Sequence, residues 1–290
     1  MLKKFKASIF IILTVLAWVY VFFEAPNLNP LYPDGAFFWA AIITIYTVVF
    51  ALMKFGEITF NGFHKSTQNG KPQNPFGYNA TKKFPKWVKF AIAIPWLYIG
   101  VMLIISSVFF NWKAYRDQLG EPEIKKFTSE VQAIDITQVP VVDKMLAYNL
   151  ASKKLGERPS LGSQTTPGEP TIQMVNGELV WVVPLHHSGL FKWLFNMQGT
   201  PGYIKISATN PNDIDYVEGY KIKYHPNSYL LNDLHRHVRF TKGLFTGITD
   251  YSFELDDTGK PYWVVSTYKN ERFFALPEAT GAITVDATTG

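Results

Sequence analysis

Three long apolar stretches lie in the first part of the chain, and no later segment is apolar over such a length. They cover about residues 7–23, 36–53 and 88–110, and the last carries Lys89 as its only charge. Each stretch is long enough to cross the hydrocarbon core of a bilayer as a helix. The pattern predicts a membrane anchor over residues 1–112, followed by a domain without membrane spans.

The first apolar stretch has the basic start that signal peptides and membrane spans share. It follows the head Met-Leu-Lys-Lys-Phe-Lys and ends at Glu24-Ala25-Pro26, without the small-x-small pattern of a cleavage site. A second apolar stretch follows about a dozen residues later. These features favour an uncleaved span.

Lysines concentrate between the second and third stretches, where residues 54–89 hold seven of them and one acid. Under the positive-inside rule, the N-terminus and the loop 54–87 lie in the cytoplasm, and residues 113–290 lie outside. A functional alternative is contact with lipid headgroups through Lys82, Lys83 and Lys86. The simpler interpretation is that these lysines only set the topology.

Composition narrows the function classes further. The chain has no cysteine, which excludes disulfides, thiolate zinc sites and cysteine nucleophiles. Its net charge of +5 reflects mainly the loop lysines, so we expect no nucleic-acid partner. The predicted spans contain no Asp, Glu, Arg or His, which argues against an ion path or a proton relay.

An internal duplication with a period of about 80 residues follows the anchor. Each copy has a strand, a helix, a hairpin ending in Trp-Val-Val, and a closing strand of pattern G-x-I-x-[IV]-x-A-T. We expect a connector at 113–130, a first repeat at 131–212 and a second repeat, complete or truncated, at 213–290. The opening strands are expected at 131–136 and 219–224, and the helices at about 142–155 and 229–241.

Local signals support these elements. The helices are expected to lay apolar residues spaced by four on a sheet, and to end at a left-handed glycine. Asn176-Gly177 is a strong hairpin signal, and Asp256 and Asp257 precede a weaker one as turn formers. The predicted class is α+β, with three transmembrane helices and two helix-on-antiparallel-sheet units. The expected helix faces are Val142, Leu146 and Leu150, then Leu230, Leu234 and Val238, and the expected helix stops are Gly156 and Gly243.

The chain's last strand, ending Val-Asp-Ala-Thr-Thr-Gly at residues 285–290, resembles the V-D-A-x-T-G strand of the PepSY domain. The first copy matches less well, with Ser207 in place of Asp and Asn210 in place of Gly. The resemblance covers about residues 131–290. It implies tandem PepSY-like repeats that bind or restrain a partner protein.

The histidines give the only pattern that suggests a metal. Neighbouring histidines on a strand point to opposite faces, and positions two apart on a helix do not share a face. Because the sequence shows no carboxylate at ligand spacing, we interpret them as surface or capping residues and expect no catalytic, cofactor or metal site. A metal-dependent enzyme remains a minor alternative. The residues concerned are His186, His187, His225, His235 and His237.

Aromatic loops lie between the Trp-Val-Val strand and the closing strand of each copy. One interpretation is a contact site for a partner protein or the membrane surface, and the other is a lid on each repeat's own core. The candidate contact residues are Leu190, Phe191, Trp193, Leu194 and Phe195 in the first copy, and Phe273 and Phe274 in the second.

Together these features predict a non-enzymatic, multi-pass protein of the bacterial cell membrane. Its extracytoplasmic repeats would bind or restrain a partner protein, either a peptidase or a cell-envelope assembly. The alternative is an accessory subunit of an envelope enzyme or transport complex that docks through its transmembrane helices. The expected partners are membrane lipid and protein, with no cofactor, and a homo-oligomer stays open.

Overall fold

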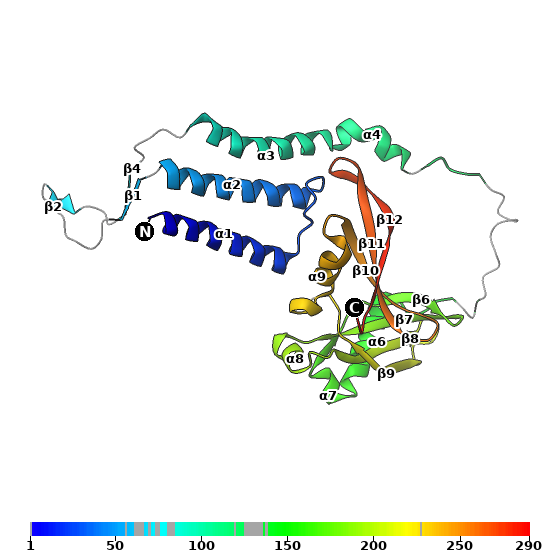
Figure 1. Ribbon diagram of the computed structural model, residues 1–290. Coiled ribbons are helices and arrows are strands. Elements are labelled where there is room, and N and C mark those ends of the chain that lie inside the picture. The colour runs from blue at the N-terminus through cyan, green and yellow to red at the C-terminus, as the bar shows by residue number, and fades with distance from the viewer. Residues whose placement is uncertain are drawn as a thin grey trace. The chain divides into compact units, whose positions relative to one another are not determined.

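The computed structural model describes residues 2–55, 57–60, 67–68, 71–72, 76–79, 85–118, 120–124, 136, 139–226 and 228–290. Contacts divide the chain into two units. The first is Met1–Trp112 with Arg272–Leu276, and the second is Lys113–Glu271 with Pro277–Gly290. Helices dominate the first unit and antiparallel sheets the second, so the predicted α+β class is confirmed (Figure 1).

Among the described residues of the first unit, three helices are long and apolar enough to cross a membrane. They are α1 (Leu2–Glu24), α2 (Pro33–Phe55) and α3 (Lys86–Ile105). Side chains link them in pairs: the Thr14 and Tyr46 hydroxyls lie 2.7 Å apart, and the Trp96 indole N–H donates to Thr44 Oγ1 at 2.9 Å. The three predicted spans are confirmed as helices.

The third span ends earlier than predicted. Instead of one helix to residue 110, α3 stops at Ile105 and α4 (Val108–Asp117) starts after Ser107. The Asn111 side-chain amide donates to the carbonyls of Ile105 at 2.6 Å and of Ser107 at 3.1 Å, so a side chain takes the place of continuing helix bonds.

The described residues of the loop between α2 and α3 include short antiparallel pairs. β1 (Glu57–Phe60) pairs with β4 (Phe76–Asn79), and β2 (Thr67–Gln68) pairs with β3 (Lys71–Pro72).

The first sheet of the second unit is antiparallel throughout. β7 (Glu178–His187) lies at its centre. One edge of β7 pairs with β5 (Thr165–Pro167) and β6 (Thr171–Val175), and the other edge pairs with β8. β8 (Thr200–Ser207) pairs in turn with β9 (Ile214–Ile222). The predicted turn between β6 and β7 is confirmed: Asn176 and Gly177 have φ of 51° and 82°, the positive values that a type I′ turn requires.

The second sheet has the order β10 (Gly247–Leu255), β11 (Pro261–Arg272) and β12 (Ala275–Asp286). The strand predicted at 219–224 as part of the second repeat instead lies largely in β9 and extends the first sheet, because it pairs with β8. Its expected first-copy counterpart, 131–136, lies outside the described residues except for Ile136.

The two copies repeat the same hydrogen bonds. The Trp181 indole donates to Val142 O and the Trp263 indole to Tyr224 O, each at 2.8 Å and across 39 residues. After each closing strand, an alanine carbonyl, of Ala208 or Ala287, accepts the N–H of that same Val142 or Tyr224. The duplicated sequence therefore makes equivalent connections.

The first sheet is covered by α6 (Lys144–Gly156) on one face. Asp143 starts this helix by accepting the Leu146 N–H at 2.7 Å. The predicted contact stripe is wrong for Leu146, which is 38% exposed, because the helix buries Ala147, Ala151 and Leu155 instead. The two alanines let the helix backbone lie close to the sheet.

The second predicted helix is three short segments: η2 (Leu230–Asn232), α9 (Leu234–Val238) and η3 (Arg239–Gly243). Leu234 and Val238 are buried as predicted, but Leu230 is 48% exposed and has a positive φ. The predicted left-handed glycine stops are also wrong. Gly156 ends α6 and Gly243 ends η3, and neither has a positive φ.

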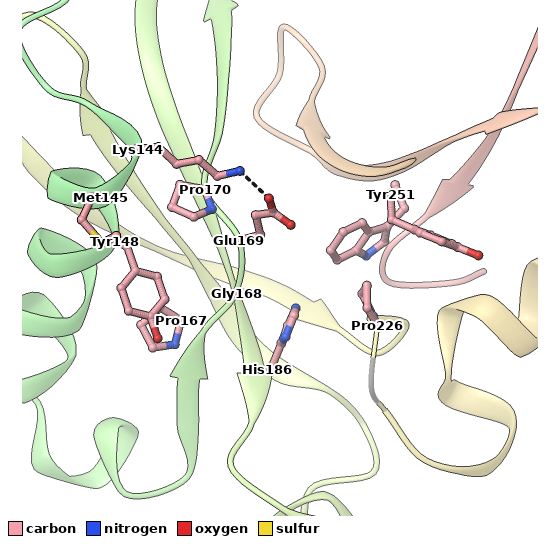
Figure 2. Close-up of a pocket in the computed structure, with 11 residues that line it drawn as sticks. Lys144, Met145, Tyr148, Pro167, Gly168, Glu169, Pro170, His186, Pro226 and Tyr251 are labelled. Atoms are coloured by element: carbon pink, nitrogen blue, oxygen red, sulfur yellow. Dashed lines mark hydrogen bonds and ion pairs between the residues drawn. The ribbon is translucent and has the colours of Figure 1, made fainter. Parts of the chain in front are cut away.

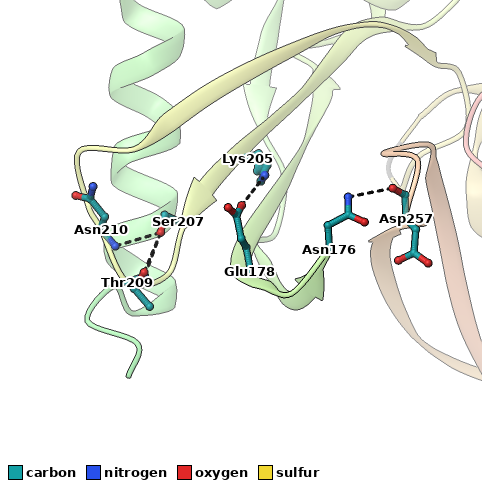
Figure 3. A network of polar contacts seen from close by, with 7 residues as sticks. All are labelled: Asn176, Glu178, Lys205, Ser207, Thr209, Asn210 and Asp257. Carbon is teal, nitrogen blue, oxygen red and sulfur yellow. Dashed lines mark hydrogen bonds and ion pairs between the residues drawn. The ribbon is translucent and has the colours of Figure 1, made fainter. Parts of the chain in front are cut away.

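The other face of the first sheet joins the second copy in one hydrophobic core. Val180, Val182 and Tyr203 are buried there with Phe253 and Trp263. Polar bonds cross the same boundary. The Gln173 side chain bonds both Phe253 O and Leu255 N, and the Asn176 side chain donates to Asp257 O at 3.1 Å (Figure 3). The two copies therefore share one core.

Candidate functional site

Apolar side chains point outward from α8 (Leu190–Phe195) in the second unit. Phe191 and Phe195 are 71% and 80% exposed, and Leu190 and Leu194 are about half exposed. Trp193 is buried instead, and its ring centre lies 5.5 Å from that of Tyr229. A single tryptophan thus holds a helix whose other apolar residues face solvent.

The segment preceding α9 extends this apolar area. The Asn232 side chain donates to Met197 O at 3.3 Å, and Tyr229 touches Trp193, so residues 229–232 lie against α8. This segment brings two exposed leucines. We call the combined area the α8 surface: Leu190, Phe191, Leu194, Phe195, Met197, Leu230 and Leu231.

Helix geometry explains why the candidates separate. With about 100° between successive residues, positions 190, 191, 194 and 195 fall on one side, and 193 falls away from them. Trp193 therefore matches the core-lid interpretation, and the other four match the contact-site interpretation. Contiguous apolar patches on soluble surfaces are uncommon unless they bind something.

The second aromatic loop differs from the first, because a tight turn replaces the helix. Phe273 is 51% exposed with a φ of 55°. Phe274, grouped with the first unit, donates its backbone N–H to Ser106 Oγ at 2.9 Å, and its ring meets Tyr98 edge-on.

The three candidate headgroup lysines are only partly placed. Lys86 is exposed at the first residue of α3. Lys82 and Lys83 lie outside the described residues.

A pocket of about 710 Å³ opens between the two copies within the second unit (Figure 2). An ion pair between Lys144 and Glu169 lies at one side, and both side chains are largely exposed. Aromatic and proline residues dominate the rest of the wall, as in many ligand pockets. Other lining residues include Tyr148, Pro167, Pro170, His186, Pro226, Tyr251 and Trp263.

Three histidines meet beside this pocket. The His186 ring stacks on His225 with centres 4.7 Å apart, and His187 Nδ1 lies 3.1 Å from His225 Nε2. The expectation of surface or capping histidines is wrong for His225, which is fully buried. The remaining two point elsewhere: His235 meets the Tyr251 hydroxyl at 2.6 Å, and His237 meets Gly290 O at 2.9 Å.

Burial controls the charge of this cluster. It lowers the pKa of His186 to about 4 and the pKa of His225 to about 3, and the neighbouring histidines act in the same direction. Burial also lowers the pKa of His187, against the hydrogen bond to Asn196 O. At neutral pH all three rings are therefore uncharged.

His187 and His225 make three close contacts, which as hydrogen bonds would need three N–H protons, one more than two neutral rings carry. His225 Nδ1 faces Pro226 O at 3.0 Å and His187 Nε2 faces Asn196 O at 3.2 Å, and carbonyls only accept. A bond between the two rings needs a third proton. Two neutral rings supply two protons, so one of the three contacts lacks a hydrogen.

The chemistry available here is that of packed, neutral imidazoles. His186 Nε2 is buried without a hydrogen-bond partner among the described residues. A Cβ on Gly168 would lie 2.7 Å from this atom, so glycine is what admits the ring. Within the described ranges, no group of three or more His, Cys, Asp or Glu residues is arranged to hold a metal ion.

The closing Val-Asp-Ala-Thr-Thr-Gly stretch forms a turn around Asp286. One carboxylate oxygen accepts the backbone N–H and hydroxyl of Thr288 and the N–H of Thr289, and the other meets Lys260 Nζ at 2.6 Å. Although burial opposes ionisation, the hydrogen bonds from Lys260 and Thr288 hold the pKa of Asp286 well below its usual range.

In the first copy, Ser207 Oγ takes the position of this carboxylate and accepts the N–H groups of Thr209 and Asn210 (Figure 3). The motif thus has a local turn-forming role in both copies.

Sequence reasoning did not select Met197, Leu230 or Leu231 for the apolar surface. A signal existed for Met197, which directly follows the aromatic run. The two leucines were assigned to a helix, and only their positions beside α8 identify them.

Comparisons with protein-family models, with curated proteins and with solved structures each find no match.

Proposed function

We propose that this protein is a membrane-anchored interaction module whose second unit binds a partner protein through the α8 surface. One observation carries the proposal. Trp193 fixes α8 to the core, while Phe191 and Phe195 remain more than two-thirds exposed. Leaving such rings in water forgoes burial free energy, which a partner would recover.

The composition of the α8 surface suits protein binding. Phenylalanine and methionine are enriched at the centres of interfaces, where a few large side chains carry most of the affinity. Four of its residues, Leu190, Phe191, Leu194 and Phe195, lie on a helix already held by a buried tryptophan. Little conformational entropy is lost when such a helix binds.

The location of the partner follows from the loop lysines. The positive-inside rule places the loop between α2 and α3 in the cytoplasm and the second unit outside the cell. A partner on that side belongs to the bacterial cell envelope. The resemblance to PepSY domains supports a role in binding or restraining a peptidase or an envelope assembly.

Binding, rather than catalysis, also fits the histidine cluster. Its ring nitrogens lie within hydrogen-bonding distance of carbonyls and of one another, and the rings are uncharged at neutral pH. The nearby carboxylate Glu169 pairs with Lys144. These are contacts that position chain segments at the junction of the two copies.

Site-specific photo-crosslinking in cells tests the proposal on the full chain. A photoreactive residue replaces Phe191 or Phe195, and a matched control replaces Met174, which is 56% exposed on β6 of the same unit. We expect one envelope protein to be captured from both α8 positions and not from the control.

Three outcomes would contradict the proposal. Adducts with lipid alone would make α8 a membrane contact. Adducts only with a second copy of the chain would make it a self-association surface. Equal capture from Met174 would show that the α8 surface is not selective.

A further inference from the structure

The outer edge of β12 lacks the strand that covers its counterpart in the first copy. β7 and β8 correspond to β11 and β12, since each pair leads through the same closing motif. β8 has β7 on one edge and β9 on the other. β12 pairs with β11, and in the described part of the chain no strand pairs with its second edge.

A glycine marks the same place on both strands. The closing motif aligns Gly202 of β8 with Gly281 of β12, and their φ values are 138° and 156°. A Cβ on Gly202 would lie 2.0 Å from Val217 O, so this glycine admits the backbone of β9. On Gly281 a Cβ would meet only Thr267 Oγ1, at 3.7 Å. The space that a strand carbonyl fills in the first copy is open in the second.

Charged residues and prolines are also sparse along this edge. Proteins protect free strand edges with charges, prolines or bulges, because unpaired N–H and C=O groups recruit other strands. On β12, Pro277 and Glu278 lie near the turn, but residues 279–285 contain neither proline nor charge. Most of that stretch is exposed.

We infer that the free edge of β12 accepts an extended segment of a partner protein as an added antiparallel strand, in the position that β9 takes on β8. This inference rests on the proposed function as an interaction module, and names a second mode of contact. Main-chain hydrogen bonds would supply affinity and alternate side chains specificity.

The register of β9 on β8 describes the segment expected. Ile214 lies opposite Ile206, and Tyr216 lies opposite Ile204. The partner should therefore place apolar residues opposite Val285 and Ile283. Ala282 stands where β8 has Tyr203, which leaves room for a larger side chain.

A second copy of β12 fits this edge less well than a partner segment. Antiparallel pairing of two β12 strands about Ala282 would place Glu278 of each copy opposite Asp286 of the other. Like charges directly opposite one another destabilise a sheet.

A synthetic peptide with the sequence of β9, Ile-Asp-Tyr-Val-Glu-Gly-Tyr-Lys-Ile, is the probe. Fluorescence anisotropy measures its binding to the full chain in detergent micelles. We expect saturable binding with one peptide per chain. Methylating alternate backbone nitrogens of the peptide, which removes strand hydrogen bonds without touching the protein, should weaken binding by about tenfold or more.

Gly281→Val should abolish peptide binding, because its Cβ occupies the space reserved for the incoming carbonyl. Gly177→Val is the matched control: Gly177 also has a positive φ and open space around its Cβ, but it lies in the turn between β6 and β7. The control should bind the peptide like the unmodified chain.

The inference is overturned if the peptide does not bind, or if Gly281→Val leaves binding unchanged, which would place the peptide elsewhere. It is also overturned if the chain forms a dimer that Gly281→Val dissolves, since the occupant would then be a second copy. Crosslinking from Phe191 does not involve β12. Failure here and failure of the proposed function are therefore distinguishable.

Discussion

Lowering the pH from 7 to about 4.5 is expected to destabilise the second unit, by on the order of 2 kcal/mol for each of His186 and His225. The pKa of His186 is about 4 and that of His225 about 3 in the folded chain, against 6.5 for a histidine exposed to water. Between these values the unfolded chain binds more protons than the folded chain, and acid therefore favours unfolding. The contribution is fully present above pH 6.5 and is lost as the pH falls through the folded pKa values, about 4 for His186 and about 3 for His225.

Urea unfolding of the full chain in micelles, followed by tryptophan fluorescence at a series of pH values, measures this effect. His225→Asn removes a proton-binding group from the cluster and should reduce the slope of stability against pH. Phe191→Ala, at a side chain that does not titrate, is the control and should leave the slope unchanged. A slope that His225→Asn does not alter would exclude the cluster as its source.

Phe253→Ala is expected to lower the free energy of unfolding by about 3–5 kcal/mol, as large-to-small changes of buried aromatics do. Phe253 is fully buried, and its ring centre lies 5.0 Å from Trp263 and 6.1 Å from Tyr203. These neighbours come from both copies. The cavity would therefore weaken the whole second unit rather than one repeat.

Phe191→Ala provides the control, because this ring is 71% exposed and its removal should change stability by less than about 0.5 kcal/mol. The shared core predicts that the second unit unfolds in one transition in both variants. Two separate transitions, with only one shifted by Phe253→Ala, would show instead that the copies are stable independently.

Features set by neighbouring residues were predictable from the sequence. The spans follow from apolar length, and the turn at Asn176-Gly177 follows from the positive φ that these residue types tolerate. The polar residues Ser106, Ser107 and Asn111 indicated the early end of α3 in the sequence. The prediction ran the helix through them because the residues on both sides are apolar.

Features set by distant residues were not predictable. The β9 strand joins the first sheet because β8 offers a free edge, and no local pattern shows which sheet a strand will join. The burial of His225 depends on His186 in the other copy. On α6, spacing favoured leucines, whereas the distance between helix and sheet selected alanines.

For the α8 surface, the sequence predicted the segment but not which of its residues face solvent. The aromatic run from Leu190 to Phe195 stood out in the sequence, but six residues give too short a period to separate a core face from a solvent face. The burial of Trp193 against Tyr229 in the structure shows which side of α8 faces the core.

Direct binding between the full chain and the protein captured at α8 tests the central claim. Both would be purified, and affinity measured for the unmodified chain and for a variant combining Phe191→Ser with Phe195→Ser. We predict at least about tenfold weaker binding by the variant, or about 1.4 kcal/mol, with an unchanged unfolding midpoint. Equal affinity of the two chains would contradict the claim that the α8 surface binds the partner.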